Sequence, residues 1–372
     1  MKEKNMNVLI QMCHPAHFHL YKNVAKNLMA DGHKVFILIK TKDILEDLLQ
    51  QSGLPYHNIL KESHRKSKIG ILYDLIVRVR RMIPFVRTNH IDLLTGSTVE
   101  VAQTGWLTRK YRVNTGEDDM DVVPLFAKMA GPFIETLLSP RVCNNFGLES
   151  KSVKYESYHE LAYLHPNHFQ ADKKIVEKYF KIETPYYILR FSSLNAYHDD
   201  GIKGINTEIA QKLIDILKPY GRIFITSERE LEPQFEPYRI KINTLDMHHV
   251  MAFADLYIGD SQTMAAEAGV LGVPFVRFND FVGRIGYLNE LENVYHLGYG
   301  IKASESGSTK KMYGVVKEIL SMPNRKEEWQ IRRQKMLSEK IDYAKFLTWF
   351  IENYPESKKA IHGNPNIQWQ FK

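Results

Sequence analysis

The sequence predicts an α/β fold of two Rossmann-like domains that face each other across a cleft. Residues 7–12 and 35–39 are apolar runs typical of buried parallel strands, and an amphipathic segment separates them. A similar strand–helix–strand order recurs in the second half of the chain. The length of 372 residues accommodates two such domains. We therefore expect domains at residues 1–160 and 161–355, followed by a polar tail at 356–372.

The elements of the first half begin with the strand at 7–12 and a loop at 13–17. A helix is expected at 18–30, because Leu20, Val24 and Leu28 are about one turn apart. Gly32 is a suitable C-cap for this helix, and the strand at 35–39 completes a βαβ unit. Further strands are expected at 92–95 and 111–115, with a helix at 99–110 between them.

The elements of the second half repeat this order. Strands are expected at 186–191, 222–226, 256–259 and 274–277, with helices at 208–217 and 263–271. Residues 155–172 contain Pro166 and three histidines and are expected to form the hinge. Residues 341–354 are apolar and aromatic at helical spacing, so we expect a C-terminal helix that packs back across both domains.

The composition excludes several classes of protein. Hydrophobic residues make up 44% and charged residues 25%, which is ordinary for a soluble globular chain. Cys13 and Cys143 are too few for a disulfide framework or a four-thiolate zinc site. The chain opens with no secretory signal and contains no apolar run long enough to span a membrane. We therefore expect a cytoplasmic enzyme or binding protein.

The net charge of +7 indicates an anionic partner, and most of the excess lies in residues 1–164. Residues 61–87 combine eight Lys and Arg with apolar residues partly at helical spacing. This pattern is typical of a helix on an anionic membrane surface. The alternative is an ordinary helix with a solvated basic face. No nucleic-acid module accompanies the charges, so we expect no nucleic-acid partner.

The strongest chemical signal lies at residues 260–274, which follow a strand and open a helix. Ser261 and Thr263 can cap this helix, and its first N–H groups, with Gln262, form a site suited to a diphosphate. Glu267 follows one turn later, where its carboxylate can accept hydrogen bonds from both ribose hydroxyls. The alternative is a capped helix with Glu267 merely exposed.

This segment resembles the nucleotide-sugar site of GT-B enzymes. UDP-N-acetylglucosamine 2-epimerase has a similar Asp-Ser-Gly-Gly stretch, a ribose-binding Glu and a following Leu-Gly-x-Pro. The lipid II-forming glycosyltransferase of peptidoglycan synthesis has a similar small-residue loop. Gln262 and Thr263 stand here where those enzymes usually have glycines, which allow the backbone to approach phosphate. The matching residues are Asp260, Ser261, Glu267, Gly272 and Pro274.

Nearly the whole chain resembles the "domain of unknown function 354" family, whose members are similar to GT-B glycosyltransferases. The resemblance implies a GT-B-like fold, a UDP-linked sugar as donor and a saccharide or lipid-linked saccharide as acceptor. It implies that the enzyme needs no cofactor. It also implies that the protein acts in surface polysaccharide or glycolipid assembly and lies peripherally at the inner face of the plasma membrane. The residues that carry it are 14–17, 158–166, 188–191, 259–261 and 349–355.

Two groups in the first domain are candidates for acceptor binding. His14 and His17 follow the first strand, where acid/base chemistry or acceptor contact is expected, and the GT-B resemblance implies the latter. The alternative is that Pro15 shapes the turn while one histidine caps the helix. Zinc would need a further distant ligand that no spacing indicates, so we expect no metal. Gly96 and Ser97 end the next strand, where Gly96 would let a substrate approach.

Glu117, Asp118 and Asp119 follow a later strand and form a cluster of carboxylates. Mutual repulsion raises the pKa of one member and makes it a proton acceptor near neutral pH. A glycosyltransferase needs such a base for the acceptor hydroxyl. The alternative is a solvated acidic loop.

Arg190 ends the first strand of the second domain, where it would neutralise a departing diphosphate. His249 is interpreted either as a phosphate contact or as a helix-packing residue. The sequence thus predicts a metal-independent glycosyltransferase, with a nucleotide-sugar 2-epimerase or hydrolase, or a non-catalytic nucleotide-sugar-binding protein, as alternatives. The other expected nucleotide-sugar contacts are Ser192, Asn195, Ser227 and Glu228.

Overall fold

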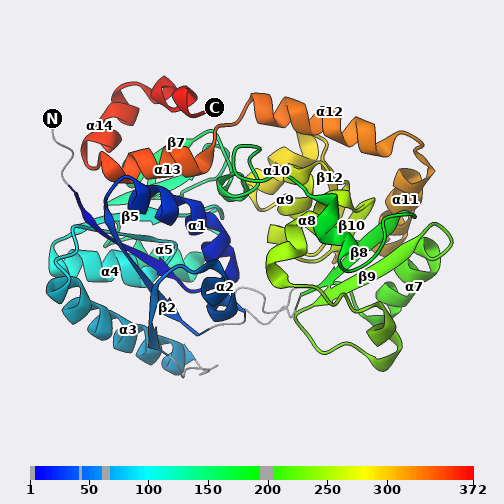
Figure 1. Cartoon of the computed structure of the whole chain (residues 1–372), viewed down its shortest axis with the longest axis horizontal. Helices are drawn as coiled ribbons and strands as arrows, with labels where there is room; N and C mark the ends of the chain where they lie inside the picture. The colour runs from blue at the N-terminus through cyan, green and yellow to red at the C-terminus, as the bar shows by residue number, and fades with distance from the viewer. Residues whose placement is uncertain (1–4, 42–43, 61–67, 193–203) are drawn as a thin grey trace. The chain divides into compact units, whose positions relative to one another are not determined.

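The computed structural model describes residues 5–41, 44–60, 68–192 and 204–372, and the chain divides into two compact units (Figure 1). The first unit combines Met1–His168 with Lys340–Lys372, and the second is Phe169–Glu339. These boundaries differ from the expected 1–160 and 161–355, because the chain returns to the first unit at Lys340. The expected tail at 356–372 is folded: it contains α14 (Glu356–Gly363) and a 3₁₀ helix at Pro365–Phe371.

Seven parallel strands form the sheet of the first unit, in the order β3-β2-β1-β4-β5-β6-β7. Residues Val8–Met12 of β1 are all buried, as the apolar run predicts for a strand covered on both faces. The strands are β1 (Asn7–Met12), β2 (Lys34–Lys40), β3 (Tyr56–Leu60), β4 (Leu93–Gly96), β5 (Tyr111–Thr115), β6 (Thr136–Pro140) and β7 (Ser152–Tyr155).

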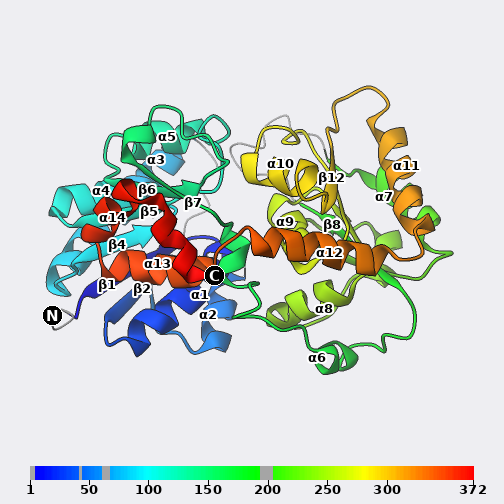
Figure 2. The same ribbon diagram turned by 90° about the horizontal axis from the view of Figure 1, so that it is seen from above.

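Helices cover this sheet on both faces (Figures 1 and 2). Helix α1 begins at Pro15, three residues before the predicted start, because His14 caps it and proline suits the first helical position. Its buried face packs beside α13 (Tyr343–Glu352), which belongs to the first unit. The other helices of the unit are α2 (Leu45–Ser52), α3 (Lys68–Thr88), α4 (Val99–Thr108) and α5 (Pro124–Ala130).

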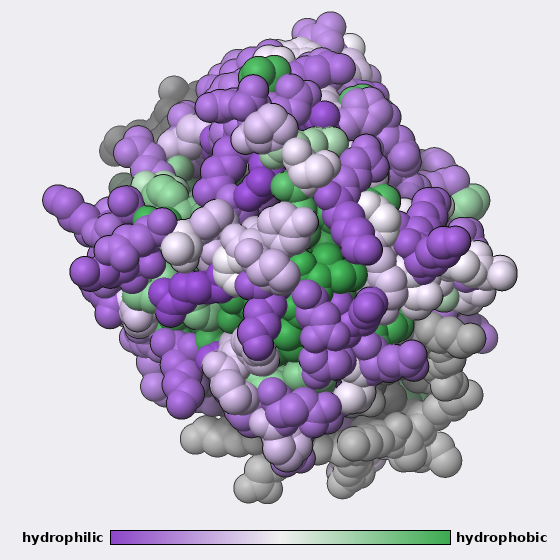
Figure 3. All heavy atoms as spheres, turned by 90° about the vertical axis from the view of Figure 1, so that its right-hand side faces the viewer, coloured by the Kyte–Doolittle hydropathy of each residue, from purple (hydrophilic) through white to green (hydrophobic). Residues whose placement is uncertain are grey.

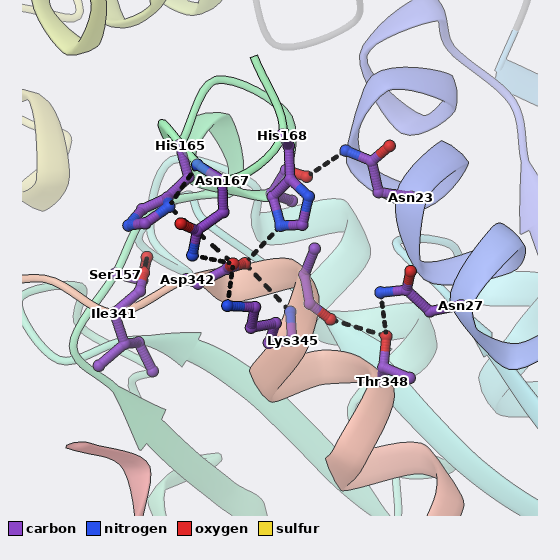
Figure 4. Close-up of polar contacts among 12 residues, drawn as sticks. Asn23, Asn27, Ser157, His165, Asn167, His168, Ile341, Asp342, Lys345 and Thr348 are labelled. Carbon is purple, nitrogen blue, oxygen red and sulfur yellow. Dashed lines mark hydrogen bonds and ion pairs between the residues drawn. The ribbon is translucent and has the colours of Figure 1, made fainter. Parts of the chain in front are cut away.

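A buried carboxylate in the first unit contacts residues near both points where the chain changes unit (Figure 4). Asp342 is fully buried at the N-cap of α13, where its side chain accepts a hydrogen bond from Lys345 N. Its Oδ1 lies 2.7 Å from His168 Nε2, and its Oδ2 accepts a 2.9 Å bond from Asn167 Nδ2. His168 ends the first segment of the unit, so this network joins its two chain segments.

Five parallel strands form the sheet of the second unit, in the order β12-β11-β10-β8-β9. Every residue of β10 is buried, and α9 packs against the sheet through small residues. The strands are β8 (Tyr186–Phe191), β9 (Arg222–Ser227), β10 (Leu256–Gly259), β11 (Phe275–Phe278) and β12 (Gly298–Ile301).

Seven α-helices accompany this sheet among the residues that the structure describes. Viewed from the side of α7 and α11, the surface is mostly hydrophilic, and hydrophobic residues gather near its centre (Figure 3). The helices are α6 (Lys173–Glu177), α7 (Thr207–Leu217), α8 (Met247–Phe253), α9 (Gln262–Leu271), α10 (Gly286–Asn293), α11 (Ser308–Ser321) and α12 (Arg325–Ser338).

Candidate functional site

Polar residues gather where the strands of the first unit end. The strands β1, β4, β5, β6 and β7 are parallel, so their carboxyl ends lie at the same edge of the sheet. This edge is where ligands bind in open α/β sheets. The polar residues at or beyond these strand ends include His14, His17, Ser97, Glu117, His159 and Glu160.

His14 and His17 both help to build the turn between β1 and α1. His14 Nδ1 accepts a 3.2 Å hydrogen bond from Ala16 N and thereby caps α1. His17 Nδ1 accepts a 3.3 Å bond from Cys13 N. Both side chains are half-buried. One ring nitrogen of each histidine therefore has a structural role, and His14 is the helix cap that the alternative interpretation expected.

Gly96 is required by its neighbouring strand. Its φ is +151°, and an added Cβ would lie 2.7 Å from the carbonyl oxygen of Gln11. The backbone of β1 therefore accounts for this glycine without a substrate. Ser97 Oγ lies 2.7 Å from Thr115 Oγ1, which in turn lies 3.0 Å from the hydroxyl of Tyr21. Hydroxyl contacts thus link the ends of β4 and β5 to α1.

Glu117 is held by the residues that follow β7. Its Oε1 accepts a 2.7 Å hydrogen bond from His159 N, and its Oε2 lies 3.3 Å from His159 Nδ1. Its carboxyl group also hydrogen-bonds to that of Glu160. The Glu117 side chain is 11% exposed, and Glu160 is almost fully buried. Two carboxyl groups and an imidazole therefore meet at this edge of the sheet.

The surroundings shift the protonation of this group strongly. Burial, followed by the nearby charge of Glu160, raises the pKa of Glu117 well above its usual value. Burial, followed by the charge of His17, lowers the pKa of His159 to about 3. His159 is therefore neutral at neutral pH, and its ring has one donor and one acceptor nitrogen. Glu117, one of the expected bases, has a raised pKa chiefly because it is buried.

The other two carboxylates of the expected cluster differ from Glu117. Asp119 is buried, and its Oδ1 accepts a 2.8 Å hydrogen bond from Asn144 N. It therefore orders the loop after β6. Asp118 is half-buried, and its charge helps to raise the pKa of Glu117. The expectation of a solvated acidic loop fits neither Glu117 nor Asp119.

In the second unit, two arginines flank a glycine at the carboxyl ends of three strands. Gly259 of β10 is in register with Arg190 of β8 on one side and with Arg277 of β11 on the other. Arg277 is fully buried, and its Nε donates a 2.9 Å hydrogen bond to Glu292 Oε1. Arg190 is 14% exposed, so it is the more accessible cation of this row.

Helix α9 begins directly beyond this row. Ser261 is its N-cap and accepts a 3.4 Å bond from Met264 N, which confirms the prediction for Ser261 but not for Thr263. Gln262 and Thr263 form the first turn and are half-buried. Asp260 is fully buried, and its two carboxylate oxygens accept bonds from Ser192 N and Ile205 N. Asp260 therefore orders backbone, and burial raises its pKa to about 6.

Arg190 reaches across to the neighbouring strand β9. Its Nη1 donates a 2.8 Å hydrogen bond to Thr226 Oγ1, and its Nη2 pairs with Glu228. Ser227 Oγ donates to Arg229 O and accepts from Arg229 N, which shapes the turn after β9. The expected contact residue Asn195 lies outside the described residues.

Glu267 is buried in α9 and pairs with a histidine of α8. Its Oε1 lies 3.0 Å from His248 Nε2, and both side chains are less than a tenth exposed. The expectation of an exposed Glu267 is therefore wrong. His249 Nδ1 accepts a 3.0 Å hydrogen bond from Asp172 N, and its ring packs against Phe169. The packing interpretation of His249 agrees with these contacts.

The search for a metal site and for a membrane span covers only the residues that the structure describes. There, no group of three or more His, Cys, Asp or Glu side chains is arranged to hold a metal ion. No helix in the same part of the chain is long and apolar enough to cross a membrane.

The family of the chain follows from a match to a family model. Residues 6–280 match the model described as "Protein of unknown function (DUF354)", which covers well over half of the sequence. The chain belongs to the DUF354 family. This DUF354 protein matches no curated protein.

Solved structures show which fold this DUF354 protein has. A co-structure of S. aureus MnaA with UDP aligns with a TM-score of 0.68 at 10% identity, covering 96% of this chain and 97% of that one. The glycotransferase of kitacinnamycin aligns with a TM-score of 0.64 at 12% identity, covering 94% of this chain and 99% of that one. UDP-GlcNAc 2-epimerase from Neisseria meningitidis, bound to UDP-GlcNAc, aligns with a TM-score of 0.59 at 13% identity, covering 90% of this chain and 100% of that one. The fold is therefore GT-B-like, as the sequence predicts, and glycosyltransferases and 2-epimerases share it.

Sequence reasoning missed three residues of these two clusters as site residues. His159 and Glu160 lie far from Glu117 in the sequence, within a segment that carried the family resemblance but no assigned role. His248 likewise carried no predicted role. For His159 and Glu160 the available signal was their position shortly after the end of β7, but β7 was not predicted as a strand.

Proposed function

We propose that this DUF354 protein is a metal-independent GT-B-type glycosyltransferase. It would move a sugar from a nucleotide-diphosphate sugar, UDP-linked, to an acceptor hydroxyl. The second unit would bind the nucleotide sugar, and the first unit would bind an acceptor saccharide or lipid-linked saccharide. The product would belong to surface polysaccharide or glycolipid assembly. The main observation in support of the proposal is that Arg190 of β8 is in register with Gly259, the last residue of the strand that leads into α9.

The diphosphate would bind at the start of α9. The first N–H groups of a helix have no partner within it, and they carry the positive end of the helix dipole. The Ser261 side chain accepts a hydrogen bond from Met264 N. The N–H groups of Gln262 and Thr263 precede Met264 in the first turn of the helix. Arg190 is in register with Gly259, two residues before Ser261. A cation and helix N–H groups at one sheet edge suit a diphosphate.

The ribose would bind at Glu267. Its carboxylate is fixed by the 3.0 Å contact with His248, so its orientation is set before any ligand arrives. A carboxylate that is held in this way can accept hydrogen bonds from both ribose hydroxyls with little loss of conformational entropy.

The reaction would be a displacement at the anomeric carbon. The acceptor oxygen forms a bond to that carbon while the bond from carbon to the diphosphate oxygen breaks. The electron pair leaves with the diphosphate, whose charge is stabilised by Arg190 and the N–H groups of α9. The acceptor proton passes to a base of the first unit, where His14, His17, Glu117 and Asp118 are the candidates and Gly96 and Ser97 lie beside them.

An assay with labelled UDP sugars, with and without a saccharide or lipid acceptor fraction, tests the proposal. Transfer requires that UDP release and label incorporation both depend on the acceptor. Conversion of UDP-N-acetylglucosamine alone would instead favour an epimerase or hydrolase, which the shared fold also suits. Binding of a UDP sugar without turnover under either condition would favour a non-catalytic binding protein.

The exposed surface of α3 supports the further proposal that the protein is peripheral at an anionic membrane. Leu72, Tyr73 and Ile76 are each about half exposed and lie within about one turn. Arg80 and Arg87 are exposed on the same helix. Such a combination of apolar and basic side chains suits the membrane interface. Residues 61–67 of the expected basic segment lie outside the described residues.

Two other basic residues of α3 have protein partners. Arg78 is buried and pairs with Glu100, and Arg81 donates a hydrogen bond to Ile59 O. Flotation with phosphatidylglycerol vesicles at low salt tests the membrane proposal. The variant R80Q/R87Q should bind less, and K310Q/K311Q, with the same change in charge on α11, should bind normally. Equal binding by all three proteins would contradict the proposal.

A further inference from the structure

We propose that Glu117 is the base for the acceptor hydroxyl, and that Glu160 and His159 are positioning residues that hold it with one proton shared between the two carboxyl groups. This inference rests on the proposed function. It selects one residue among the expected candidates and gives a role to the segment Tyr158–Pro166, which otherwise has none.

The geometry distinguishes Glu117 from the neighbouring candidates. Its two oxygens are both engaged by one residue: Oε1 by His159 N at 2.7 Å and Oε2 by His159 Nδ1 at 3.3 Å. In contrast, Asp119 is buried and orders a loop. Nδ1 of His14 and of His17 is used in the turn after β1. Glu117 combines a fixed orientation with partial exposure at the strand edge.

The position of His159 is itself fixed by packing. Its ring stacks on Tyr343 of α13, with ring centroids 5.6 Å apart and an angle of 16° between the planes. A stacked ring cannot turn without losing this contact, so its Nδ1 stays beside Glu117. His159 Nε2 is buried and has no hydrogen-bond partner among the described residues. A neutral imidazole that donates from Nδ1 leaves Nε2 as a buried acceptor.

The charges around Glu117 favour retention of a proton by the carboxyl pair. Glu160 lies against Glu117, and two carboxylates at hydrogen-bond distance do not both ionise readily. The pair would therefore carry a single negative charge at neutral pH. The titratable groups that interact with Glu117 or with its partner His159 are Asp118, Tyr155, Glu160, Tyr343 and His17.

The proton transfer is balanced. The acceptor oxygen gives its proton to Glu117 as it bonds to the anomeric carbon, and the singly charged pair becomes neutral. The pair then returns this proton to solvent before the next cycle. A base whose pKa lies nearer to neutral pH transfers protons more effectively than an ordinary carboxylate.

The first experiment requires no catalytic activity. Carboxyl resonances of ¹³C-glutamate-labelled protein are followed by NMR as the pH is varied. The wild type should show a glutamate that titrates well above the usual range. E117Q should lose this resonance, and E160Q should shift its titration to lower pH. E149Q, which changes an exposed glutamate of the same unit, should leave it unchanged. Absence of such a resonance from the wild type would overturn the inference.

The second experiment uses the transfer assay. E117Q should lower kcat by about 10²- to 10⁴-fold with unchanged UDP affinity. E160Q should move the acidic limb of the kcat/KM profile to lower pH. H159A should lower kcat, and H159N, whose amide can replace Nδ1–H, should restore part of it. Full kcat in E117Q would overturn this inference alone. Absence of transfer by the wild type would instead overturn the proposed function, while the NMR result would still test the carboxyl pair.

Discussion

His168 Nε2 lies 2.7 Å from Asp342 Oδ1, and this pair joins the residue at which the chain leaves the first unit to the helix with which it returns. Burial alone would raise the pKa of Asp342, but hydrogen bonds from His168 and Asn167 outweigh it and hold the pKa below its usual value. The ionised Asp342 carboxylate therefore stabilises the folded protein at neutral pH, and this stabilisation is lost as the pH falls through the lowered pKa.

Replacement of Asp342 by alanine should lower the free energy of unfolding by about 3 kcal/mol, because it removes a buried charge from its partners. It also removes the N-cap of α13. Urea denaturation of the wild type and of D342A measures the loss. E356A removes an exposed carboxylate at the start of α14 and should change stability by less than about 1 kcal/mol. Equal losses in the two variants would contradict the role given to Asp342.

Replacement of Gly96 by alanine should destabilise the first unit by about 2 kcal/mol or more, because the added Cβ would lie 2.7 Å from Gln11 O. Thermal unfolding measures this effect. Gly314 in α11 is the matched control, since an added Cβ there meets no atom within 4 Å. G314A should be neutral or stabilising by up to about 1 kcal/mol. If G96A were as stable as G314A, the steric explanation of Gly96 would fail.

Replacement of Glu292 by alanine should cost about 3–5 kcal/mol, because it leaves the fully buried guanidinium of Arg277 without its carboxylate. The double variant R277M/E292L should recover most of this loss, since an apolar pair avoids burial of a charge. Chemical denaturation of the three proteins measures the two differences. A double variant that is less stable than E292A would show that the pair is needed for packing rather than for charge balance.

Asp260 should make stability fall as the pH rises from 5 to 7. Burial raises its pKa to about 6 in the folded state, so the folded protein binds more protons than the unfolded chain in this range. Relative to D260N, the wild type should lose about 1 kcal/mol of unfolding free energy between these pH values. Denaturation at both pH values measures the difference. If the difference in unfolding free energy between the wild type and D260N did not change with pH, the raised pKa of Asp260 would be refuted.

Three strands with mostly apolar sequences, β1, β8 and β10, were expected at the bounds that the structure has. The more polar β5 was also expected at its observed bounds. β3, β6, β7 and β12 were not predicted, because they are short and carry polar or small residues such as His57, Ser139, Lys154 and Gly298. Apolar periodicity is a weak signal in strands of this kind.

Pairs that are distant in the sequence were beyond sequence reasoning. Ser261 was predicted as a cap because capping depends on residues within one turn. The contact of Glu117 with His159 spans 42 positions and depends on the order β5-β6-β7 in the sheet. The return of residues 340–372 to the first unit likewise follows from tertiary packing of α13 against α1.

Calorimetric titration of UDP and a UDP sugar into the full chain tests the central claim most directly. The account predicts binding by the wild type and a loss of at least about tenfold in affinity in both R190Q and E267Q. E230Q changes an exposed glutamate of the second unit and should bind as the wild type does. Unchanged affinity in R190Q and E267Q, or no binding by the folded wild type, would contradict the assignment of the second unit to the nucleotide sugar.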